Sequence, residues 1–131
     1  MNVFDLNFVA IMAAVVASML SGAAWYSIFA KPWMKAVGYS EVPQPDPKIY
    51  IVAAIAQLII ALTLSILFAH FPSIELVSGV VAGFFLWLGF CAAPMAVNHR
   101  FQSKGWDLTL IDAGFWLVVF VLQGGIIGWL E

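Results

Sequence analysis

The stretch that decides the fold reads Gly22-Ala-Ala-Trp25-Tyr26-Ser-Ile-Phe-Ala-Lys31-Pro32-Trp33-Met-Lys35-Ala-Val-Gly38. Here a long apolar run ends in a Trp-Tyr pair and passes into a short segment with two lysines and a third aromatic residue. Trp and Tyr rings have an apolar body and a polar edge, so they settle where hydrocarbon meets lipid headgroups. Proline suits the first turn of a helix and interrupts its interior. The stretch therefore predicts the cytoplasmic end of a membrane helix that turns into a short interfacial helix over residues 33–37, ended by Gly38.

The composition is that of an integral membrane protein. Of the 131 residues, 64% are hydrophobic and only 9% are charged, whereas a soluble domain carries about 25% charged residues. A chain of this length forms one domain, so we expect residues 1–131 to make a single bundle. The net charge of -2 and the lack of a basic patch argue against nucleic-acid binding.

Four apolar stretches are long enough to cross a bilayer, which takes about 20 residues. Lipid offers the backbone no hydrogen-bond partners, so each stretch must be a helix. The predicted helices are residues 6–28, 49–71, 74–97 and 108–130. The sequence thus predicts an all-α fold, a four-transmembrane-helix bundle of two hairpins, with the short interfacial helix in the first cytoplasmic loop.

The basic residues predict the orientation. Lys and Arg are retained on the cytoplasmic side of membranes, and all five lie in the first and third loops, at Lys31, Lys35, Lys48, Arg100 and Lys104. We therefore expect both chain termini outside the cytoplasm.

Small residues recur at every fourth position in three of the helices. They are Ala10, Ala14, Ser18 and Gly22 in the first, Gly79 and Gly83 in the third, and Gly124 and Gly128 in the fourth. Such faces let helices approach closely in lipid. They serve either self-association or packing within the bundle, and the sequence leaves both open.

Polar side chains inside the apolar runs are the candidates for function, because ionisable groups at membrane depth are costly. Asp112 lies about one turn inside the cytoplasmic end of the last helix, and Gln123 lies on the same stripe of that helix. Gln57 is near the middle of the second helix. These three residues predict a polar pathway. The alternative is that Asp112 pairs with Arg100, Lys104 or Lys31 and that the glutamines join helices by hydrogen bonds.

A second group of residues lies at the cytoplasmic ends of the helices. His99 could titrate near neutral pH and Arg100 could hold an anion, or both could cap a helix C-terminus. The predicted cytoplasmic mouth of the pathway consists of Trp25, Tyr26, Lys31, Trp33, Asn98, His99 and Arg100.

Signatures of metal, cofactor and enzyme chemistry are absent from the sequence. Cys91 is the only cysteine, and the two histidines, His70 and His99, are expected on opposite membrane faces, so we expect no metal site. There is no glycine-rich phosphate loop and no nucleophile elbow. We therefore expect neither an enzyme nor a cofactor.

Two motifs resemble a known family. The first is Gly22-x-x-Trp25-Tyr26-Ser27 with Phe29-x-Lys31-x-Trp33 and then Gly38, and the second runs from Ile111-Asp112-x-Gly114-Phe115 to Gly124-x-Ile126-x-Gly128-Trp129. They resemble the bacterial membrane family catalogued as domain of unknown function 1761. The resemblance implies a four-helix integral membrane protein, which we place in the bacterial inner membrane, and it implies no activity.

Two functions fit these observations. One is a subunit of a homo-oligomeric transporter or channel for a small solute or ion, with its path between protomers. The alternative is a non-catalytic accessory or scaffold protein that binds a partner or membrane lipids through the first loop, with Trp33, Lys31 and Lys35 among the headgroups.

Overall fold

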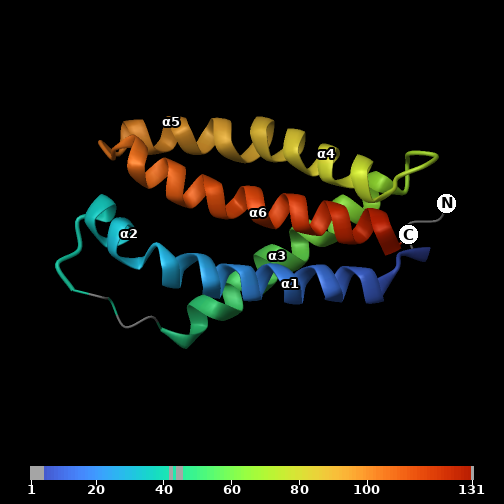
Figure 1. The fold of residues 1–131 in the computed structure, drawn as a ribbon, viewed down its shortest axis with the longest axis horizontal. Helices are drawn as coiled ribbons and strands as arrows, with labels where there is room; N and C mark the ends of the chain where they lie inside the picture. The colour runs from blue at the N-terminus through green and yellow to red at the C-terminus, as the bar shows by residue number, and fades with distance from the viewer. Residues whose placement is uncertain (1–4, 42, 44–45, 131) are drawn as a thin grey trace.

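The computed structural model describes residues 5–41, 43 and 46–130. In these residues all regular structure is helical (Figure 1), and no strand is present. The elements are α1 (Phe8–Ile28), α2 (Ala30–Val37), α3 (Pro47–Phe68), α4 (Leu76–Trp87), the π-helical segment η2 (Leu88–Ala92), α5 (Ala93–Phe101) and α6 (Trp106–Leu130).

The predicted fold class is confirmed. In the described part of the chain, four helical runs are long and apolar enough to span a membrane, and α4, η2 and α5 together make one of them, Leu76–Phe101. The second run begins at Pro47 and ends at Phe68, two to three residues before the predicted bounds. Asp46 sets this start, because its side chain accepts a hydrogen bond from the backbone N–H of Lys48 at 3.0 Å, as helix N-caps do.

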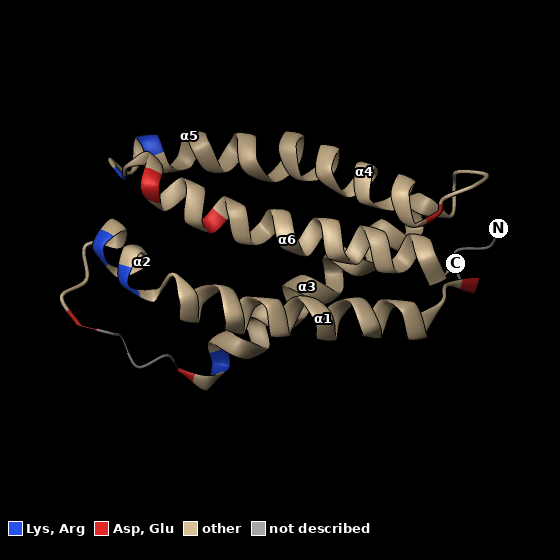
Figure 2. Cartoon of the chain, in the orientation of Figure 1, with Lys and Arg blue, Asp and Glu red and all other residues tan. Residues whose placement is uncertain are grey.

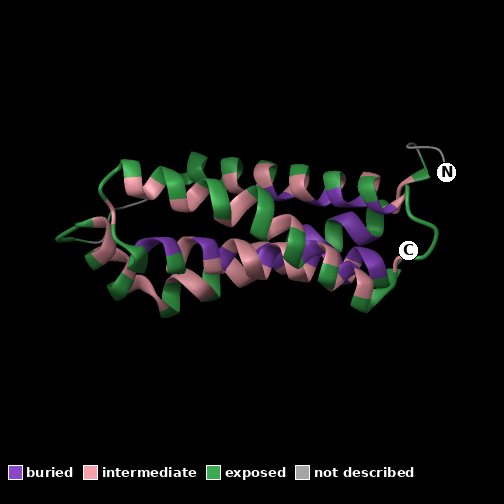
Figure 3. Ribbon diagram, turned by 90° about the horizontal axis from the view of Figure 1, so that it is seen from above, coloured by how far each residue is buried: buried purple, intermediate pink, exposed green. Residues whose placement is uncertain are grey.

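Helix α6 is the central element of the bundle. It contacts α1 on one side and α4 on the other, and α3 crosses obliquely against α1 and α6 (Figure 1). The buried residues lie on the faces that the helices turn toward one another (Figure 3). The apolar core joins α1, α3 and α6 and consists of Ile11, Ala14, Val15, Ala61, Leu64, Phe68 and Ile127.

The small-residue faces are used inside the bundle. A Cβ atom added at Gly79 would collide with the backbone oxygen of Gly124, and one added at Gly124 would collide with that of Gly79. Gly83 and Gly128 meet the opposing backbone in the same way. The backbones of α4 and α6 therefore touch along two turns, which is the packing that glycines permit in lipid. These faces no longer argue for self-association.

Helix α4 does not continue regularly into α5. Residues Leu88–Ala92 form a π-helical turn. Ala93 follows, and then Pro94, which stands in the first turn of α5. Proline has no N–H to donate, and its ring clashes with the carbonyl four residues earlier, here that of Phe90. The wider turn accommodates Pro94 inside a helix that the sequence predicted as unbroken.

The short helix after α1 is also confirmed, with a longer extent than predicted. Helix α2 spans Ala30–Val37, so Pro32 lies in its first turn. It ends at Gly38, whose φ of 96° is left-handed, and the backbone N–H of Tyr39 bonds back to the oxygen of Met34 at 2.9 Å. Glycine permits this conformation at little cost.

Candidate functional site

A groove lined by residues of α1, α2, α3, α5 and α6 opens at the end of the bundle that carries α2. It has a volume of about 700 Å³. The residues that line it are Tyr26, Ala30, Trp33, Met34, Pro43, Ile49, Tyr50, Met95, Asp112 and Trp116. We call it the Asp112 groove, because Asp112 supplies its one acidic side chain among these residues.

Asp112 is held by Tyr26. The Tyr26 hydroxyl donates to Oδ1 of Asp112 at 2.8 Å, and this bond joins α1 to α6. Within the described residues the carboxylate has no ion-pair partner. Of the three basic residues considered as its partners, Arg100 bonds to Thr109 and Lys104 to the backbone of Val37, and Lys31 is exposed on α2.

Aromatic rings form the wall of the groove around this bond. The ring of Tyr26 packs edge-on against Trp33 at 6.2 Å and against Phe115 at 5.3 Å between ring centroids. Trp33 in turn packs against Tyr39 at 5.7 Å. These contacts attach α2 to the bundle, so that Trp33 lies over the Asp112 groove rather than free at the surface.

Gln123 and Gln57 lie deeper in the bundle. Gln123 is fully buried, and its Nε2 donates to Ser18 Oγ at 2.9 Å and to the backbone oxygen of Gln57 at 3.1 Å. Gln57 is only 2% exposed. The Oε1 atoms of both glutamines have no hydrogen-bond partner in the described structure, which is unusual because buried polar atoms are nearly always paired.

The predicted polar line is therefore divided into two parts. Asp112 lies in the groove with Tyr26, whereas Gln123 lies eleven residues further along α6, about 16 Å away at 1.5 Å per residue. Gln57 does meet the stripe of α6, as expected, but at Gln123 and through its backbone.

Trp25, predicted at the cytoplasmic mouth, joins two helices instead. Its Nε1 donates to the backbone oxygen of Ile111 at 3.0 Å. Its ring lies where a side chain at Gly114 would be, so this glycine admits the ring. Trp25 thereby fixes the position of its neighbour Tyr26 beside Asp112.

The other residues predicted at the mouth fall into two places. Lys31 is exposed on α2, and Asn98 is exposed on α5. His99 and Arg100 both contact Thr109 of α6. His99 Nδ1 lies 2.7 Å from Thr109 Oγ1, and Arg100 Nη2 donates a hydrogen bond to the same Oγ1 at 2.6 Å. Arg100 also stacks on Trp106, with its Cζ 3.8 Å from the ring centroid. His99 and Arg100 thus close the α5–α6 hairpin, outside the lining of the groove.

Seven groove residues were missing from the candidate sites of the sequence: Ala30, Met34, Pro43, Ile49, Tyr50, Met95 and Trp116. Tyr50, Met34 and Met95 come from three different elements, and only the folded chain brings them together. Trp116 could have been chosen, because it follows Asp112 by four residues and so shares its helix face.

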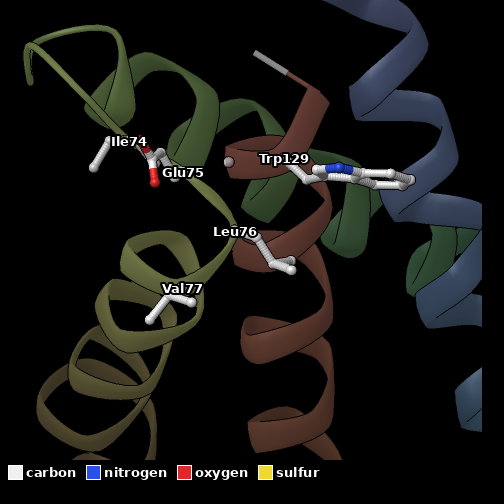
Figure 4. Close-up of a pocket in the computed structure, with 6 residues that line it drawn as sticks. Ile74, Glu75, Leu76, Val77 and Trp129 are labelled. Carbon is white, nitrogen blue, oxygen red and sulfur yellow. The ribbon is translucent and has the colours of Figure 1, made fainter.

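A smaller hollow of about 330 Å³ lies at the opposite end of the bundle, between the start of α4 and the last turn of α6 (Figure 4). Its acidic residue, Glu75, is the N-cap of α4, and its backbone N–H bonds to Ser78 Oγ at 2.7 Å. Capping of α4 therefore accounts for Glu75, the acidic residue of this hollow.

The charges are distributed unevenly along the bundle. All five Lys and Arg residues lie at the end that carries α2 and the α5–α6 link (Figure 2). Glu75 precedes α4 and Asp5 precedes α1, at the other end. The first and third loops, to which the sequence assigned all five basic residues, therefore lie at the same end of the bundle.

These features define a class: an all-α, multi-pass membrane protein with an aromatic groove around one carboxylate. The chain belongs to the family described as Protein of unknown function (DUF1761), whose model matches residues 9–128. This agrees with the resemblance drawn from the sequence motifs. Comparison with curated proteins and with solved structures finds no match.

Proposed function

We propose that this protein binds a small solute or ion in the Asp112 groove and moves it as a subunit of a homo-oligomeric transporter or channel. In this proposal it resides in the bacterial inner membrane, with the basic end of the bundle in the cytoplasm and both termini outside. The groove then opens near the cytoplasmic face.

One observation carries the proposal. A carboxylate in a membrane-spanning helix lines a cavity of about 700 Å³ and is bound by a single neutral hydroxyl, that of Tyr26. A charge at membrane depth costs several kcal/mol unless it is paired, and such residues commonly mark substrate or ion pathways. A structural role alone would be served better by an ion pair with one of the nearby basic residues.

The tightly packed core beyond the groove supports a path shared between protomers. Beyond Gln57 and Gln123, the core residues Ile11, Leu64 and Ile127 are at most 1% exposed. A solute that enters the groove therefore has to leave sideways, along the surface of the bundle. A second protomer at that surface would complete the path, which supports the homo-oligomer.

A scaffold role is the second candidate. Lys31 and Lys35 are exposed on α2 and could contact anionic headgroups or a partner. Trp33, however, lies in the groove, and Lys104 Nζ bonds to the last carbonyl of α2, Val37, at 2.9 Å. Helix α2 is thus bound to its own bundle, which favours the groove over the loop as the functional surface.

Flux through proteoliposomes tests the proposal. The probes are potassium, tetramethylammonium, acetate and glycerol, which cover an inorganic cation, an organic cation, an anion and a neutral solute. We expect Asp112→Asn to reduce the flux of at least one probe about tenfold or more, and Gln57→Ala to reduce it less. Met12→Leu, a change on the outer face of α1, is the control. Equal flux of all four probes in the wild type and in Asp112→Asn would contradict the proposal.

A further inference from the structure

The charge of the Asp112 groove is not balanced by the residues that line it. In the described chain this lining contains Asp112 and no Lys, Arg or His. Lys31, which follows the lining residue Ala30, is exposed on α2, and Arg100 and Lys104 bond elsewhere. A cavity lined by charge of one sign concentrates solutes of the opposite sign. The groove therefore favours a cation over an anion.

The Asp112 carboxylate has one oxygen available to a cation. Its Oδ1 accepts the Tyr26 hydroxyl at 2.8 Å. Its Oδ2 has no hydrogen-bond partner in the described structure, and it is not one of the unpaired side-chain atoms that are buried there. In this it differs from the Oε1 atoms of Gln57 and Gln123, which are buried. A ligand in the groove can thus reach Asp112 Oδ2.

The side chains of the groove offer few donor atoms to a bare metal ion. Calcium takes about six to eight oxygen ligands, and magnesium requires an octahedral set. Side-chain oxygens in the lining come only from Asp112, Tyr26 and Tyr50. An inorganic cation in the groove would have to keep most of its water, so this donor set suits an organic cation better.

Aromatic rings from four helices border the same space as Asp112. The rings belong to α1, α2, α3 and α6, and the residues are Tyr26, Trp33, Tyr50 and Trp116. Tyr26 and Trp33 pack edge to face with 6.2 Å between ring centroids, which holds these two rings in place. The face of an aromatic ring attracts cations, and such rings are the usual binding site for quaternary ammonium groups.

The remainder of the lining is apolar. It consists of Ala30, Met34, Pro43, Ile49 and Met95. A primary ammonium has three N–H donors, which would compete here for the oxygens of Asp112 and the two tyrosines. A quaternary ammonium has no N–H group, and its methyl groups pack against rings and aliphatic side chains. The lining therefore favours the quaternary ion over the primary one.

We propose that the solute of the Asp112 groove is a small quaternary ammonium ion, with its charge beside Asp112 Oδ2 and its methyl groups against Trp33 and Trp116. The inference rests on the proposed function and names its substrate class. The headgroup of phosphatidylcholine carries the same trimethylammonium group. That headgroup also carries a phosphate, for which the lining of the groove offers no basic residue, and so we commit to the free ion.

Calorimetric titration of the full-length protein in dodecyl maltoside tests the inference, because this detergent has neither an ammonium nor a phosphate group. The probes are choline, its uncharged carbon isostere 3,3-dimethyl-1-butanol, the primary amine ethanolamine, and potassium. We expect choline to bind about tenfold or more tightly than each of the other three probes, since only choline combines a cation with a methylated surface.

Substitutions assign the two parts of the site. Asp112→Asn should weaken choline about tenfold and leave the affinity for 3,3-dimethyl-1-butanol unchanged. Trp116→Leu, which removes a ring and keeps an apolar side chain, should weaken choline several-fold, and Trp116→Phe should weaken it less. Trp129→Leu is the matched control, because Trp129 is 69% exposed at the other end of α6. The midpoint of thermal unfolding shows that each variant is folded.

The two proposals fail in different ways. Tighter binding of ethanolamine or potassium than of choline, with the Asp112 dependence intact, would overturn the quaternary ammonium and leave the proposed function standing. An equal loss of choline affinity in Trp116→Leu and Trp129→Leu would overturn the role of the rings. Insensitivity of every probe to Asp112→Asn would overturn both proposals. Displacement of choline by added phosphatidylcholine, but not by phosphatidylglycerol, would overturn the choice of the free ion over the lipid headgroup.

Discussion

Ser103 adopts a conformation that normally belongs to glycine. It is the one non-glycine residue with positive φ in the described chain, at 60°. Its backbone N–H bonds to the oxygen of Arg100 at 3.1 Å, and that of Lys104 bonds to the oxygen of His99 at 2.9 Å. This pattern ends α5 as Gly38 ends α2, with a left-handed residue after the last turn.

The first prediction compares these two helix ends. Ser103→Gly should stabilise the protein by about 1 kcal/mol, because the left-handed conformation costs a side chain about that much. Gly38→Ala should destabilise it by a similar amount, since its φ is 96° and no atom lies within 4 Å of an added Cβ. The midpoint of thermal unfolding in detergent measures both. Opposite signs are expected, and a loss of stability in Ser103→Gly would contradict the assignment.

Single residues of the site were predictable where a polar side chain stands in an apolar, membrane-spanning run, because such a residue is costly in lipid. Asp112, Gln57 and Gln123 are polar groups in apolar runs; the structure buries both glutamines inside the bundle and places Asp112 in the groove. Their grouping was not predictable, because it depends on the angle at which α3 crosses α6. That crossing brings Gln57 to Gln123 and leaves Asp112 with Tyr26.

At the scale of the element, the contact between α4 and α6 rests on glycine backbones. The sequence indicated rows of small residues on both helices. It did not indicate which surface packs against them, because spacing alone does not say whether the opposing helix belongs to the same chain. The structure pairs Gly79 with Gly124 inside one bundle. The π-helical turn before Pro94 was likewise missed, since local periodicity continues through it.

The second prediction uses two glycines of the same helical run. Gly79→Ala should destabilise the protein by about 1–3 kcal/mol, because the new methyl group collides with the backbone of Gly124 and forces the helices apart. Gly89→Ala is the matched control, since nothing lies within 4 Å of its added Cβ. Unfolding in sodium dodecyl sulfate mixtures compares the two. If Gly79→Ala is no less stable than Gly89→Ala, the α4–α6 packing is wrong.

At the scale of the whole molecule, the fold class followed from composition and from the lengths of four apolar runs. The backbone of a membrane-spanning segment must satisfy its own hydrogen bonds, so each of these runs is expected to form a helix. The groove could not be predicted, because Tyr26, Trp33, Tyr50, Met95 and Asp112 come from five different helices.

The third prediction concerns orientation. In the Cys91→Ser background, Gln102→Cys in the α5–α6 link should be protected from a membrane-impermeant thiol reagent added to intact bacterial cells. Ser73→Cys, in the link at the other end of the bundle, should react. The bias that retains Lys and Arg in the cytoplasm gives this direction. Labelling of Gln102→Cys alone would reverse the proposed topology.

The most direct test of the central claim is the accessibility of the Asp112 groove to water-soluble molecules. Met95 lines the groove, whereas Met12 lies 54% exposed on the outer face of α1, where lipid would surround it. In the Cys91→Ser background, a charged methanethiosulfonate reagent on the basic side should modify Met95→Cys at least tenfold faster than Met12→Cys. Equal, slow modification of both cysteines would show that the groove is filled or closed, and would contradict its role as a solute site.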